Sequence, residues 1–169
     1  MKRFFLILLI ISLTACSVEK KTQKTKDSKG ELYNVVRVVD GDTIDIAIGD
    51  SVERVRLLAI DTPESVKPNT EVECYSVEAA DRLRELIEDK KVELESDLGQ
   101  TDRDKYGRLL RYVYLEDGTF VNKVMVAEGF ADRFYCHPRC EKEDILKEAL
   151  DFAKENSLGM WDEDNCEYR

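Results

Sequence analysis

Apolar and polar residues alternate in three successive short segments in the first third of the chain. Residues 31–48 (ELYNVVRVVDGDTIDIAI) are rich in β-branched side chains and are interrupted by Asp40-Gly41, a pair that strongly favours a hairpin turn. Gly49-Asp50 predicts a second turn, and residues 52–60 predict a third strand. Three strands joined by tight turns predict an antiparallel meander.

The rest of the chain alternates between helical and strand periodicity. Apolar residues three and four positions apart predict helices over 76–89, 119–128 and 141–156, and shorter segments predict strands over 92–95 and 109–115. Five short strands with helices between and after them suit a small closed barrel. We therefore expect an α+β fold, a five-stranded OB-fold β-barrel with three packed helices.

The N-terminal residues do not belong to this domain. Lys2 and Arg3 precede an apolar run at 4–13, which is too short to span a bilayer as a helix and is typical of an export signal. The run leads into LTAC, which resembles the lipobox of bacterial lipoproteins and so implies cleavage before Cys16 and lipidation of its sulfur. The alternative is an ordinary secretory signal with an incidental cysteine.

Residues 17–31 (SVEKKTQKTKDSKGE) contain five lysines and a single large apolar residue, a composition that predicts a flexible tether. The chain thus divides into a signal peptide with lipobox at 1–16, the tether at 17–31 and a globular domain at 32–169. This organisation predicts an extracytoplasmic protein anchored to the bacterial cell membrane through Cys16. We expect a monomer, and no segment predicts a protein partner.

Charge limits how the protein can bind polyanions. The formal net charge is -10, from 26 basic and 36 acidic residues. Loss of Lys2 and Arg3 with the signal peptide leaves 24 basic residues against 36 acidic ones, which is close to -12. This balance argues against a broad basic surface for nucleic acid, so any polyanion site must be local or assisted by a metal.

Four cysteines remain if Cys16 is lipidated: Cys74, Cys136, Cys140 and Cys166. An even number in an exported protein suggests two disulfides, for which three pairings exist. Cys136 and Cys140 lie in one short loop, YCHPRC, so a local pair is plausible and would leave Cys74 with Cys166. A zinc site with His137 is the alternative, although the spacing fits common zinc patterns poorly.

Acidic residues are concentrated at two places that the meander brings to one end of the sheet. Asp40 and Asp42 flank the first hairpin, and Asp61 and Glu64 follow the third strand. Two carboxylates with a backbone carbonyl and water suit Ca²⁺, which takes oxygen ligands in loose geometry. Pro63 restricts the backbone around it, which would hold the neighbouring acids in set directions.

Basic residues lie near the same place. Arg56 precedes the acids, and residues 100–112 contain four further cations, among them Arg108. Guanidinium groups match phosphate oxygens, and cations fixed there stabilise the charge that builds up during phosphodiester displacement. Glu64 could orient or deprotonate the attacking water. For Arg103 and Arg111 we expect only solvated surface charges.

Three separated motifs, VVDGDTIDI, RLLAIDTPE and TDRDKYGRLLRYVY, resemble in order and spacing the staphylococcal nuclease (thermonuclease) family. VNKVMVAEGFA and GMW extend the resemblance, which covers about residues 32–162. The resemblance implies an OB barrel with three helices. It also implies a Ca²⁺-dependent endonuclease that cleaves DNA and RNA and leaves 3′-phosphate ends.

The resemblance further implies a role for individual residues. These are Asp42, Asp61 and the Thr62 carbonyl as metal ligands, Arg56, Arg108 and Glu64 as catalytic groups, and Lys105, Tyr106 and Tyr135 as substrate contacts.

One departure concerns the two tyrosines that the family places at the base pocket. The first falls on Tyr135, but the second falls on His137, which could stack on a base or be a loop histidine beside a disulfide. The acidic charge also departs from the basic staphylococcal enzyme and should weaken diffusional capture of nucleic acid.

The competing hypothesis is a non-catalytic OB-fold module that binds nucleic acid or another partner. The nuclease and the binding module differ in one sequence feature, the complete set Asp42, Arg56, Asp61, Glu64 and Arg108. A protein that only binds has no physical need for the whole set.

Overall fold

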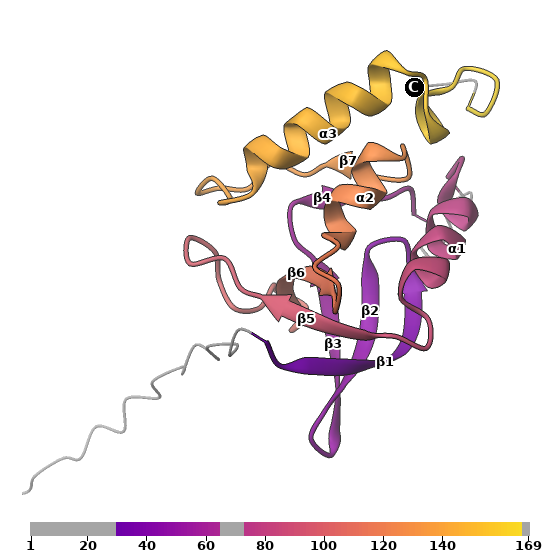
Figure 1. Ribbon diagram of the computed structural model, residues 1–169. Coiled ribbons are helices and arrows are strands. Elements are labelled where there is room, and N and C mark those ends of the chain that lie inside the picture. Colours follow the sequence, from indigo (N-terminus) through magenta and orange to yellow (C-terminus); the bar gives the residue numbers. More distant parts are fainter. Residues whose placement is uncertain (1–29, 65–72, 167–169) are drawn as a thin grey trace, which may run out of the picture.

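A computed structural model describes residues 30–64 and 73–166 (Figure 1). The predicted signal peptide, its lipidation site Cys16 and nearly all of the predicted tether lie outside these residues. In the two described segments, no helix combines the length and apolar character needed to cross a membrane.

Five strands close into a barrel in the order β1-β2-β3-β6-β5, and β5 pairs back onto β1. All neighbouring strands are antiparallel except β3 and β6, which are parallel. The described residues also contain three α-helices, so the expected OB-type α+β architecture is confirmed. The bounds are β1 Leu32–Asp40, β2 Thr43–Ile48, β3 Ser51–Leu57, α1 Ser76–Ile87, β5 Lys91–Glu95, β6 Leu109–Leu115, α2 Val121–Ala127 and α3 Glu143–Glu155.

The core fills the barrel and continues under the helices. Strand residues inside the barrel are 0–3% exposed, and they are Ile44, Ile46, Val55, Leu57, Val92, Leu94, Leu109 and Val113. Helix α1 packs on β1, while α2 lies between β6 and α3, so the helices form a cap on one side of the barrel (Figure 1). Leu146 and Ala149 on α3 are buried in this same core.

The predicted third strand, 52–60, is wrong at its C-terminal end. Strand β3 ends at Leu57, and Ala59 adopts a positive φ of 64° that turns the chain away from the barrel. The next two residues form β4 (Ile60–Asp61), which pairs with β7 (Asp132–Arg133) in a separate two-stranded sheet. The buried Asn122 fixes the turn, since it donates to Leu58 O at 2.9 Å and accepts from Val113 N at 2.9 Å.

Both disulfides suggested by the cysteine positions are present. Cys74 is bonded to Cys166, and Cys136 is bonded to Cys140. The zinc alternative at Cys136, Cys140 and His137 is therefore wrong, because both sulfurs that would have bound the metal are in a disulfide.

Candidate active site

Four chain segments meet at one end of the barrel and enclose a polar cavity of about 140 Å³. They are the end of β1 with the turn after it, the end of β3, the segment from β4 to Glu64, and the loop that precedes β6. Strand register explains the meeting: Thr43 at the start of β2 is paired with Arg56 near the end of β3. The lining residues are Asp40, Asp42, Arg56, Asp61, Thr62, Pro63, Glu64 and Arg108, which include all five residues of the predicted catalytic set.

Gly41 allows two of these segments to come close together. A Cβ atom at this position would lie 2.8 Å from Thr62 Oγ1 and 2.9 Å from the Cβ of Ala79. Real Cβ atoms do not approach other atoms this closely, so any side chain here would push the 61–64 segment away from Asp42. The glycine of the hairpin is thus also required for the closed shape of the site.

Arg56 is held in one orientation by two backbone carbonyls and two carboxylates. Its Nη1 donates to Leu57 O at 2.9 Å and to Ile60 O at 2.8 Å. Its Nη2 lies 2.8 Å from Asp42 Oδ2 and 2.7 Å from Asp61 Oδ1. The guanidinium therefore lies between the two carboxylates that the sequence predicts as metal ligands.

Asp42 is nearly inaccessible to solvent and is fixed on both oxygens. Its Oδ1 accepts from Thr43 Oγ1 at 2.9 Å, and its Oδ2 accepts from Thr62 N at 3.2 Å. Burial and the neighbouring charge of Asp42 raise the pKa of Asp40 to about 6. Such crowding of carboxylates favours the presence of a cation beside them.

The donor set fits a hard cation. Asp42, Asp61 and the Thr62 carbonyl offer only oxygen atoms, and Ca²⁺ is bound by oxygen ligands that often include water. Across residues 30–64 and 73–166, no group of three or more His, Cys, Asp and Glu side chains could hold a metal. A cation here would therefore need backbone oxygen and water in addition to the two carboxylates.

Arg108 reaches the same cavity from the loop that precedes β6. Its Nε donates to Asp104 Oδ2 at 2.7 Å, and its backbone N donates to Asp104 Oδ1 at 3.0 Å. Its Nη1 lies 3.5 Å from Thr43 Oγ1, and its guanidinium carbon lies 5.5 Å from the centre of the Tyr106 ring. Asp104 thus orients the guanidinium from behind and leaves its outer edge toward the cavity.

Glu64 lines the same cavity and is tied to the chain beyond the 65–72 segment. Its backbone N donates to Glu73 Oε2 at 3.0 Å, and its carbonyl accepts from Glu73 N at 3.2 Å. The position of the Glu64 backbone therefore depends on its pairing with Glu73.

A larger groove of about 530 Å³ adjoins the cavity and shares Arg56, Asp61 and Arg108 with it. Its lining is mainly apolar and includes Lys105 and Tyr106, two of the residues that the sequence predicts as substrate contacts, together with Phe134 and His137. Tyr135 is placed differently. It is 70% exposed, lies under the guanidinium of Arg133 at 4.1 Å, and is not part of this lining.

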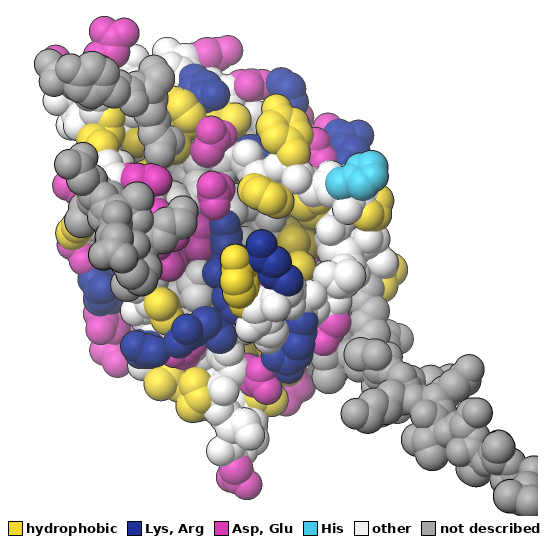
Figure 2. All heavy atoms as spheres, turned by 180° about the vertical axis from the view of Figure 1, so that it is seen from behind, with side chains coloured by type: hydrophobic (Ala, Val, Ile, Leu, Met, Phe, Trp, Pro, Cys, Tyr) yellow, Lys and Arg dark blue, Asp and Glu magenta, His cyan; other side chains and the backbone are white. Residues whose placement is uncertain are grey.

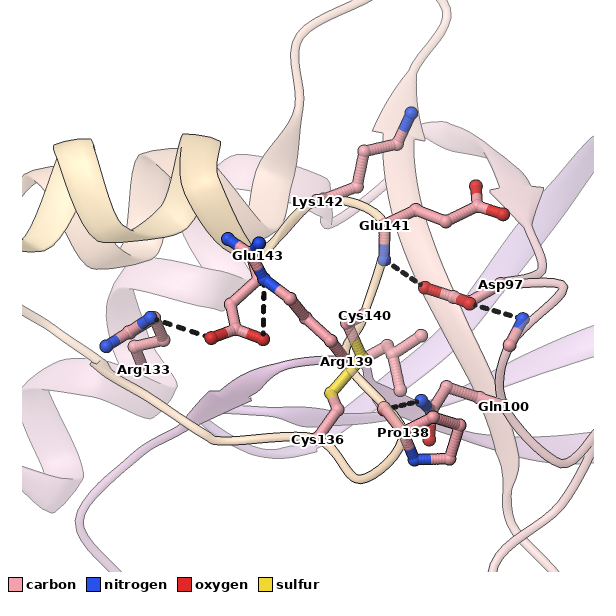
Figure 3. The surroundings of a disulfide bond; sticks show 12 residues. Asp97, Gln100, Arg133, Cys136, Pro138, Arg139, Cys140, Glu141, Lys142 and Glu143 are labelled. Atoms are coloured by element: carbon pink, nitrogen blue, oxygen red, sulfur yellow. Dashed lines mark hydrogen bonds and ion pairs between the residues drawn. A yellow bond between two sulfur atoms is a disulfide. The ribbon is translucent and has the colours of Figure 1, made fainter.

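Cys136 lines this groove. Its disulfide with Cys140 and the surroundings of that bond are shown in Figure 3. Two contacts join its loop to the segment after β5: Gln100 donates to Pro138 O, and Asp97 accepts from Glu141 N at 2.7 Å. Asp97 also accepts from the Tyr112 hydroxyl at 2.7 Å. This buried carboxylate was not anticipated from the sequence, in which it is one acid among many.

The expectation that Arg111 is a solvated charge is wrong. Its side chain is 1% exposed and pairs with Asp102 at 2.7 Å. The alternation of side chains along β6 could have predicted this burial, because Arg111 shares the buried alternate positions of the strand with Leu109, Val113 and Leu115. Arg103 behaves as expected, because its side chain is 42% exposed and pairs with Glu53 on the surface.

Comparison with known proteins identifies relatives of this chain. The family described as "Staphylococcal nuclease homologue" matches residues 54–163. The chain is 39% identical over 140 residues to "Thermonuclease" of Staphylococcus intermedius, which covers 83% of this chain and 82% of that protein. It is 43% identical over 134 residues to "SPbeta prophage-derived endonuclease YokF" of Bacillus subtilis (strain 168), covering 78% of this chain and 45% of that protein. "Endonuclease YncB" of the same strain is 40% identical over 143 residues, covering 83% and 66%.

Proposed function

The chain belongs to the staphylococcal nuclease family, and on this premise we propose that it is a calcium-dependent nuclease that cleaves DNA and RNA to 3′-phosphate ends. One observation carries the proposal: Asp42, Arg56, Asp61, Glu64 and Arg108 all line one polar cavity. A module that only binds nucleic acid would not need two acids, two fixed guanidinium groups and a further carboxylate around a single phosphate-sized space.

The two arginines bind the phosphate. Arg56 is fixed through Leu57 O and Ile60 O, and Arg108 is fixed through Asp104, so both guanidinium groups are oriented before substrate arrives. Such preorganised donors stabilise the charge that develops on the phosphoryl oxygens without reorganising during the reaction. Asp42, Asp61 and the Thr62 carbonyl would hold a calcium ion, which would supply further positive charge to a bound phosphate.

Glu64 acts on the water. Its carboxylate accepts a proton from the water that attacks phosphorus, and the bond from phosphorus to the 5′ oxygen breaks. The 5′ oxygen leaves with the bonding electrons and takes a proton from solvent water, and the 3′ side keeps the phosphate. The neighbouring apolar groove holds the base and sugar of the adjoining nucleotide, with Lys105, Tyr106 and His137 among its walls.

The decisive test is digestion of single-stranded DNA and RNA with Ca²⁺, with EGTA, and by Glu64→Gln. We expect EGTA to abolish cleavage and Glu64→Gln to slow it by roughly 10²–10⁴-fold, the usual contribution of a general base. Glu88→Gln is the control, because it removes an exposed carboxylate at the end of α1. Full cleavage in EGTA, or by the Glu64 variant, would contradict the proposal, and binding without cleavage would favour the non-catalytic alternative.

We also propose that the protein is exported and anchored by lipid at Cys16. Two disulfides support an oxidising location outside the cytoplasm. Mass spectrometry of the mature N-terminus should show a lipidated Cys16, and Cys16→Ser should release the domain from membranes. An unmodified cysteine at a cleaved N-terminus would instead indicate an ordinary secretory signal.

A further inference from the structure

A second hollow of about 480 Å³ opens beside the catalytic cavity, between the β2–β3 hairpin and the loop that precedes β6. Its lining residues are Asp45, Val52, Arg54, Tyr106, Gly107 and Arg108. Lys and Arg side chains gather at the middle and lower part of one face of the molecule, on a body that is acidic overall (Figure 2). None of the roles assigned above uses Arg54 or Val52.

The hollow is continuous with the site already described. Arg108 lines this hollow, the catalytic cavity and the apolar groove, and Tyr106 lines both the hollow and the groove. A strand whose scissile phosphate lies at Arg108 and whose nucleoside occupies the groove therefore meets the hollow when it passes the Tyr106 ring.

Arg54 is built into the hollow as a fixed cation. Its Nε and Nη2 lie 2.8 Å and 3.2 Å from the two oxygens of Asp45, while its side chain stays 46% exposed. Asp45 is also paired with Arg37 at 2.7 Å, which holds the carboxylate in place from its other side. The Arg54 guanidinium is therefore oriented and still half exposed, which suits a phosphate oxygen.

The remaining walls suit a nucleoside. Tyr106 is 72% exposed and Val52 is 60% exposed, although both are large apolar side chains. An exposed aromatic ring next to a cation is the arrangement on which single-stranded nucleic acids stack, because every base has a π-face.

We propose that this hollow is a second nucleotide subsite, in which Arg54 binds a backbone phosphate of the nucleotide that follows the one in the groove. The inference rests on the proposed nuclease function and adds to it. It predicts that oligonucleotides bind more tightly than a substrate with a single nucleoside, and that Arg54 provides part of the difference.

The test compares Arg54→Ala with Arg37→Ala on two substrates. Both arginines pair with Asp45, and either variant leaves that carboxylate one guanidinium partner, but only Arg54 lines the hollow. One substrate is a single-stranded DNA 12-mer, and the other is a nucleoside with one aryl phosphodiester, which is too short to reach Arg54.

For Arg54→Ala we expect KM for the 12-mer to rise by roughly five- to tenfold at low salt, with kcat and the short substrate unchanged. The slope of log KM against log salt concentration should be smaller by about 0.7 in this variant than in the wild type, because one phosphate contact on a single strand contributes about that much. Arg37→Ala should stay within about twofold of wild type. Fluorescence anisotropy of the 12-mer on the Glu64→Gln background should show the same difference in Kd.

Equal shifts for both arginine variants would show a general charge effect and overturn the subsite, as would an unchanged KM for Arg54→Ala. A parallel loss on the short substrate would place Arg54 at the cleavage site instead. If the wild type cleaves neither substrate, the nuclease proposal itself is contradicted. The failure of the nuclease proposal is therefore distinguishable from the failure of the Arg54 subsite.

Discussion

Replacing Arg111 with methionine tests how far one buried ion pair holds the loop before β6 together. Arg111 Nη2 donates to Asp102 Oδ1 at 2.7 Å, and Nη1 donates to Leu110 O at 2.9 Å and Asp102 O at 3.2 Å. Methionine fills much of the volume but leaves the Asp102 carboxylate without this partner. Removing one member of a buried pair costs about 3–5 kcal/mol, and we expect a loss in this range.

The assay is urea unfolding at neutral pH with the disulfides intact, followed by far-ultraviolet circular dichroism. A matched control lies in the same loop: Arg103 pairs with Glu53 at 2.8 Å, but its side chain is 42% exposed. Exposed pairs contribute at most about 1 kcal/mol, so Arg103→Met should lower the free energy of unfolding by no more than that.

Two results bear directly on this reasoning. The double variant Arg111→Met with Asp102→Ala should lose less stability than the sum of the two single variants, because it leaves no unpaired buried charge. If Arg111→Met and Arg103→Met destabilise the protein equally, the buried pair does not stabilise this loop and the argument is refuted.

Two further predictions concern stability. The Cys74–Cys166 disulfide joins residues 92 positions apart, and in the chain-entropy model replacing its cysteines with serine should lower the free energy of unfolding by about 4–5 kcal/mol. The same change at Cys136–Cys140, with its separation of 4, should lower it by about 2 kcal/mol. Equal losses of stability in thermal unfolding would contradict that model. The hydrogen bond from Arg54 holds the pKa of Asp45 in the folded protein below its ordinary value of 3.8. The ionised Asp45 therefore contributes its full stabilisation of the fold above pH 3.8, and this contribution is lost as the pH falls through the pKa of the folded state. The difference in unfolding free energy between wild type and Asp45→Asn should therefore stay constant from pH 7 to about 5 and close only below about pH 4, and closure already at pH 6 would show that another group is responsible.

Local patterns were sufficient where local forces decide the structure. The alternation of residues 109–115 gave β6 with its observed bounds, and the two turns at Asp40-Gly41 and Gly49-Asp50 gave the meander. The meander also predicted that Asp42, Arg56 and Asp61 lie at one end of the sheet, and all three line one cavity, although Asp61 reaches it from β4 rather than from the third strand.

Distant contacts decided the rest. The chain leaves the barrel after Leu57 because Ile60 and Asp61 pair with β7, more than 70 positions later, and Ala59 has no sequence signal for its positive φ. Asp97 could not be distinguished from surface acids, because its partners Tyr112 and Glu141 come from β6 and the loop before α3. Periodicity does not report such pairings.

The acidic balance of the chain does not conflict with binding a polyanion, because acidic side chains are what hold the cations of the site in place. Each arginine near the cleavage site has a carboxylate partner: Arg56 has Asp42 and Asp61, Arg108 has Asp104, and Arg54 has Asp45. These pairs fix the orientation of the guanidinium groups before a phosphate arrives, so less side-chain entropy is lost on binding. Net charge governs how fast a strand is captured, whereas the stabilisation of the scissile phosphate depends on these few oriented groups.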